Sequence, residues 1–135
     1  MQPSAHDRFT GTIGDFTIRV VDLIDPSHFE EVEMPSYSSS KQVAVIAEVT
    51  NNGTREINLS YSLDLEVEIG AKNSLWSTVG YLDRVPGNPA RDEMLRPGET
   101  STMTWVFVIG ERYQPRYIEV EDSAYPGNRV EIMVR

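Results

Sequence analysis

The side chains that could do acid–base or metal chemistry are almost all carboxylates. The chain of 135 residues has 21 acidic residues, two histidines and no cysteine. A thiolate metal site and a thiol nucleophile are therefore excluded, and two histidines, His6 and His28, are too few for an imidazole metal cage. The sequence has no nucleophile elbow, P-loop or dinucleotide fingerprint. This composition favours a protein that binds rather than one that catalyses.

Calcium is the metal that these carboxylates could hold, because Ca²⁺ takes about six to eight oxygen ligands, often from acidic loops. Asp22 and Asp25 flank the end of the first expected strand, and Glu121 and Asp122 lie near the end of the sixth. The D-x-D-x-D-G spacing of a calcium loop does not occur. We therefore expect no cofactor, and we keep calcium binding by Asp22, Asp25, Glu121 and Asp122 as an alternative.

A third acidic group, Asp64, Glu66 and Glu68, has the spacing of one strand face. Neighbouring carboxylates on such a face are about 6.5 to 7 Å apart, whereas glycosidases set two carboxylates about 5 to 9.5 Å apart across a cleft. Nothing in the pattern predicts a cleft here. The stripe is more typical of a sheet face that is kept soluble, and hydrolysis is a reading that an activity screen would exclude.

The elements that must carry these residues are strands. Apolar and polar residues alternate strictly from Ile57 to Ile69, which predicts a strand with one dry face and one wet face. Further strands are expected over residues 15–24, 42–50, 74–82, 100–109, 116–121 and 129–134. The segment 42–50 is apolar on both faces, as a central strand requires. Trp105 shares a face with Met103 and Phe107 and is expected in the core.

Turn residues separate these segments. Asn52-Gly53 is expected to need a positive φ, and the Pro-Gly pairs at 97–98 and 126–127 predict turns with a left-handed glycine. About seven strands without a helix predict an all-β fold, an antiparallel β-sandwich. We assign residues 1–13 to a linker or flexible N-terminus and residues 14–135 to the sandwich domain.

Two long connections, Asp25–Ser40 and Asp83–Gly98, are candidates for a contact surface, because rigid sandwiches present loops for recognition. Trp76 neighbours the second connection and could be partly exposed at a partner surface. The candidate binding residues are His28, Glu30, Glu31, Tyr37, Trp76, Arg84 and Arg91.

The charge balance narrows the choice of partner. Twelve basic residues against 21 acidic ones give a formal net charge of −9. Such a surface repels phosphates, so we expect no nucleic-acid binding. The sequence lacks an apolar run long enough to cross a membrane, so this segment is not expected to insert into one. A protein or a cell-surface component is the expected partner, and the oligomeric state is open.

Several segments of the chain resemble one known protein family. The segment VAVIAEVTNNGTREINLSYSLDLEVE (43–68), the later LRPGET (95–100) with WVFVI (105–109), and the ending YIEVEDSAYPGNRVEIMV (117–134) are similar to an uncharacterised immunoglobulin-like domain family of secreted bacterial and archaeal proteins and lipoproteins. The opening GDFTIRVVDL (14–23) fits the first strand of that family. The mycobacterial immunoprotective extracellular antigen shares its fold. The resemblance implies an immunoglobulin-like sandwich, export from the cytoplasm, often with a lipid anchor, and no catalytic residues.

The leading hypothesis from the sequence is therefore an exported, non-enzymatic module that recognises a protein or cell-surface component through its long loops. Two alternatives remain open. One is a calcium-dependent adhesion or stability module that uses loop carboxylates. The other is a purely structural accessory domain of a larger exported assembly.

Overall fold

A computed structural model describes residues 8–36, 39–58, 65–79, 84–89, 93–122 and 127–135. Strands make up most of this part of the chain, and no helix in it is long and apolar enough to cross a membrane. The strands are β1 (Thr10–Ile13), β2 (Phe16–Ser27), β3 (Ser40–Asn51), β4 (Ile57–Asn58), β5 (Leu65–Ala71), β6 (Ser74–Ser77), β7 (Met94–Leu95), β8 (Thr100–Gly110), β9 (Tyr117–Asp122) and β10 (Arg129–Met133).

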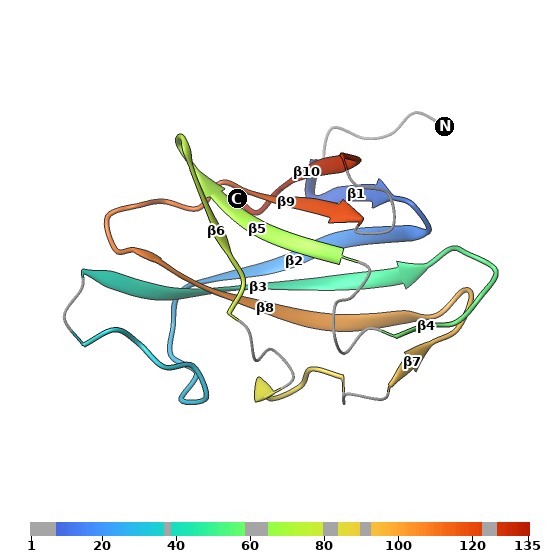
Figure 1. Cartoon of the computed structure of the whole chain (residues 1–135), viewed down its shortest axis with the longest axis horizontal. Coiled ribbons are helices and arrows are strands. Elements are labelled where there is room, and N and C mark those ends of the chain that lie inside the picture. The colour runs from blue at the N-terminus through green and yellow to red at the C-terminus, as the bar shows by residue number, and fades with distance from the viewer. Residues whose placement is uncertain (1–7, 37–38, 59–64, 80–83, 90–92, 123–126) are drawn as a thin grey trace.

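Two antiparallel sheets form the sandwich, and this confirms the predicted fold class. The first sheet has the order β1-β2-β3-β8 and the second has the order β10-β9-β5-β6. The short strands β4 and β7 pair with each other in a separate two-stranded sheet. Figure 1 shows the two large sheets as layers, with β5, β9 and β10 above β2, β3 and β8.

The core lies between the inner faces of the two sheets. Val45 of β3 pairs with Trp105 of β8, and both are almost completely buried. The second sheet contributes Ile69, Ile118 and Ile132, which are fully buried. The predicted core position of Trp105 and the central place of β3 between β2 and β8 are therefore confirmed.

The segment predicted as one strand from Ile57 to Ile69 is divided between two sheets. Ile57 pairs with Leu95 of β7, whereas Leu65 pairs with Asp122 of β9. Asp64 and the other residues of 59–64 lie outside the described residues. Within β5 the predicted alternation holds, since its odd-numbered side chains are buried and Glu66 is exposed.

The N-terminal boundary of the domain differs from the predicted one. Residues 10–13, which the sequence assigned to a linker, form β1 and pair with β2 from Thr10↔Arg19 to Ile13↔Phe16. Gly11 lets this strand approach the second sheet, because a Cβ there would lie 2.7 Å from Cγ1 of the buried Ile132. A four-residue strand with a single large apolar residue gives too weak a pattern to be predicted.

The turn glycines follow the prediction in two cases out of three. Gly98 and Gly127 have φ values of 83° and 95°, as expected for left-handed residues. Gly53 does not have a positive φ, so the predicted conformation of Asn52-Gly53 is wrong. A side chain there would instead require the carboxylate of Asp15 to move, because a Cβ on Gly53 would lie 2.8 Å from it.

Candidate interaction surfaces

The first long connection is fixed to the outer face of the first sheet. β2 continues to Ser27, so the loop begins at residue 28. The amide of Gln42, on β3, then pairs with the backbone of Phe29: Phe29 N donates to Oε1 at 2.8 Å, and Nε2 donates to the Phe29 carbonyl at 3.2 Å. Val32 is buried beyond this clamp. The start of this loop is therefore part of the packed domain.

The second long connection is held in the same way at β8. The amide of Asn88 makes two hydrogen bonds to the backbone of Thr104: Thr104 N donates to Oδ1 at 2.7 Å, and Nδ2 donates to the Thr104 carbonyl at 2.8 Å. Val85, three residues earlier, is buried. An amide that pairs with a backbone group of an edge strand in this manner takes the place of a neighbouring strand.

These two contacts, Gln42 with the backbone of Phe29 and Asn88 with the backbone of Thr104, lie on or beside the outer face of the first sheet. On this face Ala44 pairs with Val106, and both are fully buried although neither belongs to the inner face. Figure 1 shows the two connections on the side of the first sheet that faces away from the second sheet. The chain therefore covers part of this face with its own loops, while Arg19, Thr100 and Thr102 are exposed on the rest of it.

The predicted binding residues are spread over the molecule. His28 and Glu30 are exposed and Glu31 is half-buried on the first loop, and Arg84 is exposed on the second. Trp76 lies on β6, half-buried, and its ring packs edge-on against Tyr113 with the centroids 4.9 Å apart. Tyr37 and Arg91 lie outside the described residues. Binding through these loops stays a prediction.

The four candidate calcium ligands lie at two opposite ends of the sandwich. Asp25 is near the end of β2, where its carboxylate pairs with Lys41 Nζ at 2.9 Å and with Arg135 Nη2 at 3.5 Å. Asp122 is buried at the other end, beside Gly14, which precedes β2. The length of β2 separates these ends by roughly 30 Å, at about 3.3 Å per residue.

The remaining two candidates do not complete a site at either end. Asp22 is exposed and accepts a hydrogen bond from the backbone N of Leu23, and Glu121 pairs with Arg129. Among the described residues, no group of three or more His, Asp or Glu side chains could hold a metal ion.

The outer face of the second sheet is lined by carboxylates in direct register. Glu66 pairs with Glu121 across β5 and β9, and Glu68 pairs with Glu119. Glu119 also pairs with Glu131 across β9 and β10. We call this surface the carboxylate face, and we define it by Glu66, Glu68, Glu119, Glu121, Glu131 and Arg129.

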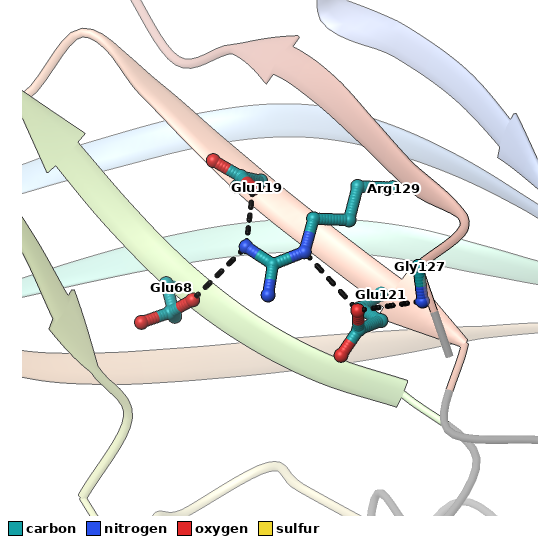
Figure 2. A network of polar contacts seen from close by, with 5 residues as sticks. All are labelled: Glu68, Glu119, Glu121, Gly127 and Arg129. Atoms are coloured by element: carbon teal, nitrogen blue, oxygen red, sulfur yellow. Dashed lines mark hydrogen bonds and ion pairs between the residues drawn. The ribbon is translucent and has the colours of Figure 1, made fainter.

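Arg129 is the cation of the carboxylate face. Its guanidinium lies 2.6 Å from Glu119 Oε1 (Nη1), 3.1 Å from Glu121 Oε1 (Nε) and 3.9 Å from Glu68 Oε1 (Nη1), as Figure 2 shows. These contacts raise the pKa of the guanidinium further. The backbone N of Gly127 donates to Glu121 at 3.1 Å and, together with Arg129, lowers the pKa of the Glu121 carboxyl.

One guanidinium does not neutralise five carboxylates. Like charges that are directly opposed on neighbouring strands destabilise a sheet, and here two such pairs meet at Glu119. Glu66 and Glu131 are exposed and form no ion pair with any described residue. The face therefore presents a concentrated negative potential to solvent.

An apolar row closes the carboxylate face at one end. Tyr117 of β9 pairs with Gly70 of β5 and with Met133 of β10, and Gly70 pairs with Leu75 of β6. The Tyr117 ring lies over Gly70, since a Cβ there would be 2.3 Å from Cζ of the ring. Leu75 is 41% exposed.

Sequence reasoning did not find the carboxylate face as a unit. The alternation of Glu66 and Glu68 was recognised, and Glu119 and Glu121 repeat the same spacing in 117–122. These repeats are the signal that was available. The pairing of β5 with β9, which are far apart in the chain, is a tertiary property that alternation does not specify.

Comparison with known proteins gives the fold. No model of a known protein family matches the chain, and no curated protein matches it. A solved structure from Bacillus subtilis, described as a "putative lipoprotein", is similar over 93% of this chain, with a TM-score of 0.64 and 11% identity. This chain spans only 38% of the length of that protein.

Two further solved structures are similar over most of their own length. A functionally unknown protein of Listeria monocytogenes has a TM-score of 0.58 and 12% identity, over 93% of this chain and 80% of its own. An uncharacterised β-sandwich protein of Clostridium difficile has a TM-score of 0.51 and 13% identity, over 93% of this chain and 89% of its own. At such identities the likeness shows the β-sandwich fold alone, and membership of the immunoglobulin-like family stays a prediction.

Proposed function

We propose that this chain is a non-enzymatic interaction domain that works outside the cytoplasm and binds a protein partner through its carboxylate face. One observation carries this proposal. The outer face of the second sheet keeps five carboxylates in register, with Glu66 and Glu131 exposed and the other three half-buried, whereas part of the outer face of the first sheet is packed under the chain's own loops. Because a sheet loses stability by opposing like charges, the arrangement is better explained by binding than by folding.

A cationic protein surface is the partner that fits this face. Its cations would form ion pairs with Glu66 and Glu131, which form none with a described residue. They would also reduce the repulsion between the paired glutamates. Charges at the rim of such an interface mainly set the association rate and the choice of partner. The apolar row at Tyr117 would add buried apolar area beside the charged contacts.

Binding without catalysis or a cofactor is part of the proposal. Beside β2 lies an open depression of about 380 Å³ whose charged lining residues are Asp22 and Arg135, the others being apolar. A carboxylate and a guanidinium without a nucleophile give no catalytic constellation. The carboxylate face itself is a sheet surface rather than a cleft, so it does not provide the paired acids of a glycosidase.

The extracytoplasmic location rests on two arguments. The sequence resembles secreted proteins and lipoproteins, and one structure of similar fold is described as a "putative lipoprotein". A chain without cysteine is compatible with either compartment, so the location is tested separately, by fractionating cells that express the full-length native protein.

Site-specific crosslinking tests the binding surface. A photoreactive amino acid is placed at position 131 on the carboxylate face, and in a matched variant at position 30, an exposed carboxylate on the first loop. Illumination of native cells is expected to crosslink the protein from position 131 and not from position 30. Crosslinks from position 30 alone would show that the loops bind the partner, and no crosslinks from either would favour a purely structural accessory domain.

A further inference from the structure

Two aromatic rings pack together at the end of the sandwich where β8 is joined to β9. Tyr113 lies in this connection, and its ring packs edge-on against that of Trp76 on β6, with the centroids 4.9 Å apart. Both side chains are half-buried. The Tyr113 ring also lies close to Gly110, since a Cβ there would be 2.8 Å from Cδ2 of the ring. Figure 1 shows this connection and the turn between β5 and β6 at the same end of the molecule.

Polar groups from two segments of the chain act on the hydroxyl of Tyr113. The guanidinium carbon of Arg112 lies 5.4 Å from the centre of the ring. A hydrogen bond from Arg112 and the charge of Arg112 lower the pKa of Tyr113 below its ordinary value of 10.0, and Ser74 and Lys72 lower that pKa further. The surroundings of this hydroxyl therefore favour a negative charge.

Lys72 and Arg112 are the two cations beside Tyr113. Both are exposed, and neither forms an ion pair with a described residue. The lack of an ion pair does not set them apart, because Arg8 and Arg55 also form none with a described residue. Lys72 and Arg112 differ from those two arginines because they act together on one hydroxyl group, whose pKa no described carboxylate shifts.

The backbone of Lys72 is strained. Ala71 pairs with Ser74, so Lys72 and Asn73 form the two-residue turn between β5 and β6. Lys72 has φ 54° and Asn73 has no positive φ, which is the pattern of a type II′ turn, whose first central residue is normally glycine. A residue with a Cβ is disfavoured in this conformation, and such strain is found most often at functional sites. The side chain of Lys72 therefore explains why a lysine occupies a position that suits glycine.

We propose that Lys72, Arg112 and the hydroxyl groups of Ser74 and Tyr113 bind the phosphate group of a phosphate monoester. These four residues are called the phosphate site. A phosphate monoester carries a charge of about −1.5 to −2 at pH 7, which two cations match. Arginine and lysine both form charge-assisted hydrogen bonds to phosphate, and the two hydroxyls can donate to its remaining oxygens. The half-buried Trp76 ring offers apolar surface to the group that bears the phosphate.

The phosphate site is separate from the carboxylate face. Ser74 and Trp76 pair with Ala71 and Ile69, whose side chains are buried, so both lie on the core side of β6 rather than on its outer side. The inference therefore does not rest on the proposed function. It also does not make the chain a nucleic-acid-binding protein, since such proteins neutralise many phosphates at once.

A titration of the purified chain with inorganic phosphate, followed by NMR, tests the inference. The ionic strength is held constant with chloride, because exposed charges respond to salt. Saturable shifts are expected at the backbone amides of Lys72 and Arg112, with a Kd on the order of 1 mM. Bound phosphate should also raise the pKa of Tyr113, because it offsets the cations that lower that pKa. A pH titration of isotope-labelled tyrosine measures this second effect.

Lys72→Gly separates binding from folding. Glycine removes the cation and suits the positive φ of the turn, so the variant should be at least as stable as the wild type and yet bind phosphate at least about tenfold more weakly. A substitution that acted only by unfolding the chain could not do both. Arg112→Gln should weaken binding to a similar extent. Arg55→Gln removes an exposed cation elsewhere and should leave binding unchanged.

Three results would overturn the phosphate site. They are the absence of a saturable shift, an equal loss of binding in Arg55→Gln and Arg112→Gln, and a pKa of Tyr113 that stays the same in saturating phosphate. Acetate at equal ionic strength is the second ligand. If acetate bound as tightly as phosphate, the assignment to phosphate would be wrong and the residues would form a carboxylate site.

Discussion

The side-chain amide of Asn51 donates a hydrogen bond to the carbonyl oxygen of Leu95 at 3.0 Å, which joins the end of β3 to β7 across 44 residues of sequence. The same nitrogen donates to the Arg55 carbonyl at 2.8 Å, and Oδ1 accepts from the backbone N of Gly53 at 2.8 Å. Asn51 is fully buried. The side chain of Asn51 thus holds the turn that follows β3 and also binds β7 at the same end of the sandwich.

Replacing Asn51 by alanine is expected to destabilise the fold strongly. The change would leave the Leu95 carbonyl without this bond in a buried position and would release the turn at Gly53. Losing several buried hydrogen bonds at once should lower the free energy of unfolding by about 3 kcal/mol. Urea denaturation measures it, with the exposed Asn52→Ala as the control. Equal effects of the two substitutions would contradict the anchoring role of Asn51.

The sequence pattern predicted which side chains are buried but not the conformation of the turn between Asn51 and Gly53. Apolar–polar alternation predicted the dry face of β5 and the buried Trp105 of β8, because burial on a strand repeats every second residue. The turn at Asn52-Gly53 was located, but its conformation was wrong. Its geometry is set by long-range contacts of Asn51 and by the carboxylate of Asp15, and local turn preferences do not contain them.

Asn88 should protect the edge of β8. Asn88→Ala would leave both the N–H and the carbonyl of Thr104 without the partners described here, which exposes an edge strand to pairing with other chains. A loss of about 2 kcal/mol in the free energy of unfolding is expected, together with faster amide exchange at Thr104 and more aggregation on heating. Hydrogen exchange followed by NMR measures the first effect directly. Unchanged exchange at Thr104 would show that the Asn88 amide does not guard this edge.

The ion pairs of the carboxylate face should make stability depend on pH. The bond from Gly127 and the contact with Arg129 lower the pKa of Glu121 from its ordinary value of 4.5. A carboxyl whose pKa is lower in the folded state stabilises the fold above its unfolded pKa, and that contribution is lost as the pH falls through the folded pKa. The stability that Glu121 provides should thus be complete at neutral pH and should fade below about 4.5.

Glu121→Gln tests this linkage. Urea denaturation at a series of pH values should show the variant less stable than the wild type at neutral pH, with the difference shrinking as the pH falls below 4.5. Glu30→Gln, an exposed loop carboxylate, serves as the control and should show no such trend. A difference between Glu121→Gln and the wild type that stays constant with pH would mean that Glu121 acts by packing rather than by charge.

Calcium is not expected to stabilise the protein. Asp25 already pairs with Lys41 and Arg135, and Asp122 lies at the far end of β2 from Asp25. A ligand that binds only the native state raises its stability by mass action, by about 2.7 kcal/mol at a hundredfold excess over Kd. The melting temperature in millimolar calcium should therefore equal that in EDTA. A rise that EDTA reverses would restore the calcium-dependent alternative.

The candidate surface could be predicted only in part, for a reason that Glu119 illustrates. Its spacing from Glu121 placed both on one side of a strand, as sequence can show. Its direct opposition to Glu131 follows from the hairpin of β9 and β10, whereas its opposition to Glu68 follows from the pairing of β9 with β5, two strands that are far apart in the chain. The long loops were located correctly, but the clamps by Gln42 and Asn88 that hold them to the first sheet depend on tertiary contacts.

Carboxyl footprinting tests the central claim most directly. Native protein in the cell envelope and dilute purified protein are labelled in parallel with a carbodiimide and an amine, and mass spectrometry measures the extent of labelling at each glutamate. Binding through the carboxylate face predicts that Glu66 and Glu131 are protected in the envelope while Glu30 and Glu31 are labelled equally in both samples. Protection of Glu30 and Glu31, with Glu66 and Glu131 unchanged, would contradict the claim and assign binding to the first loop.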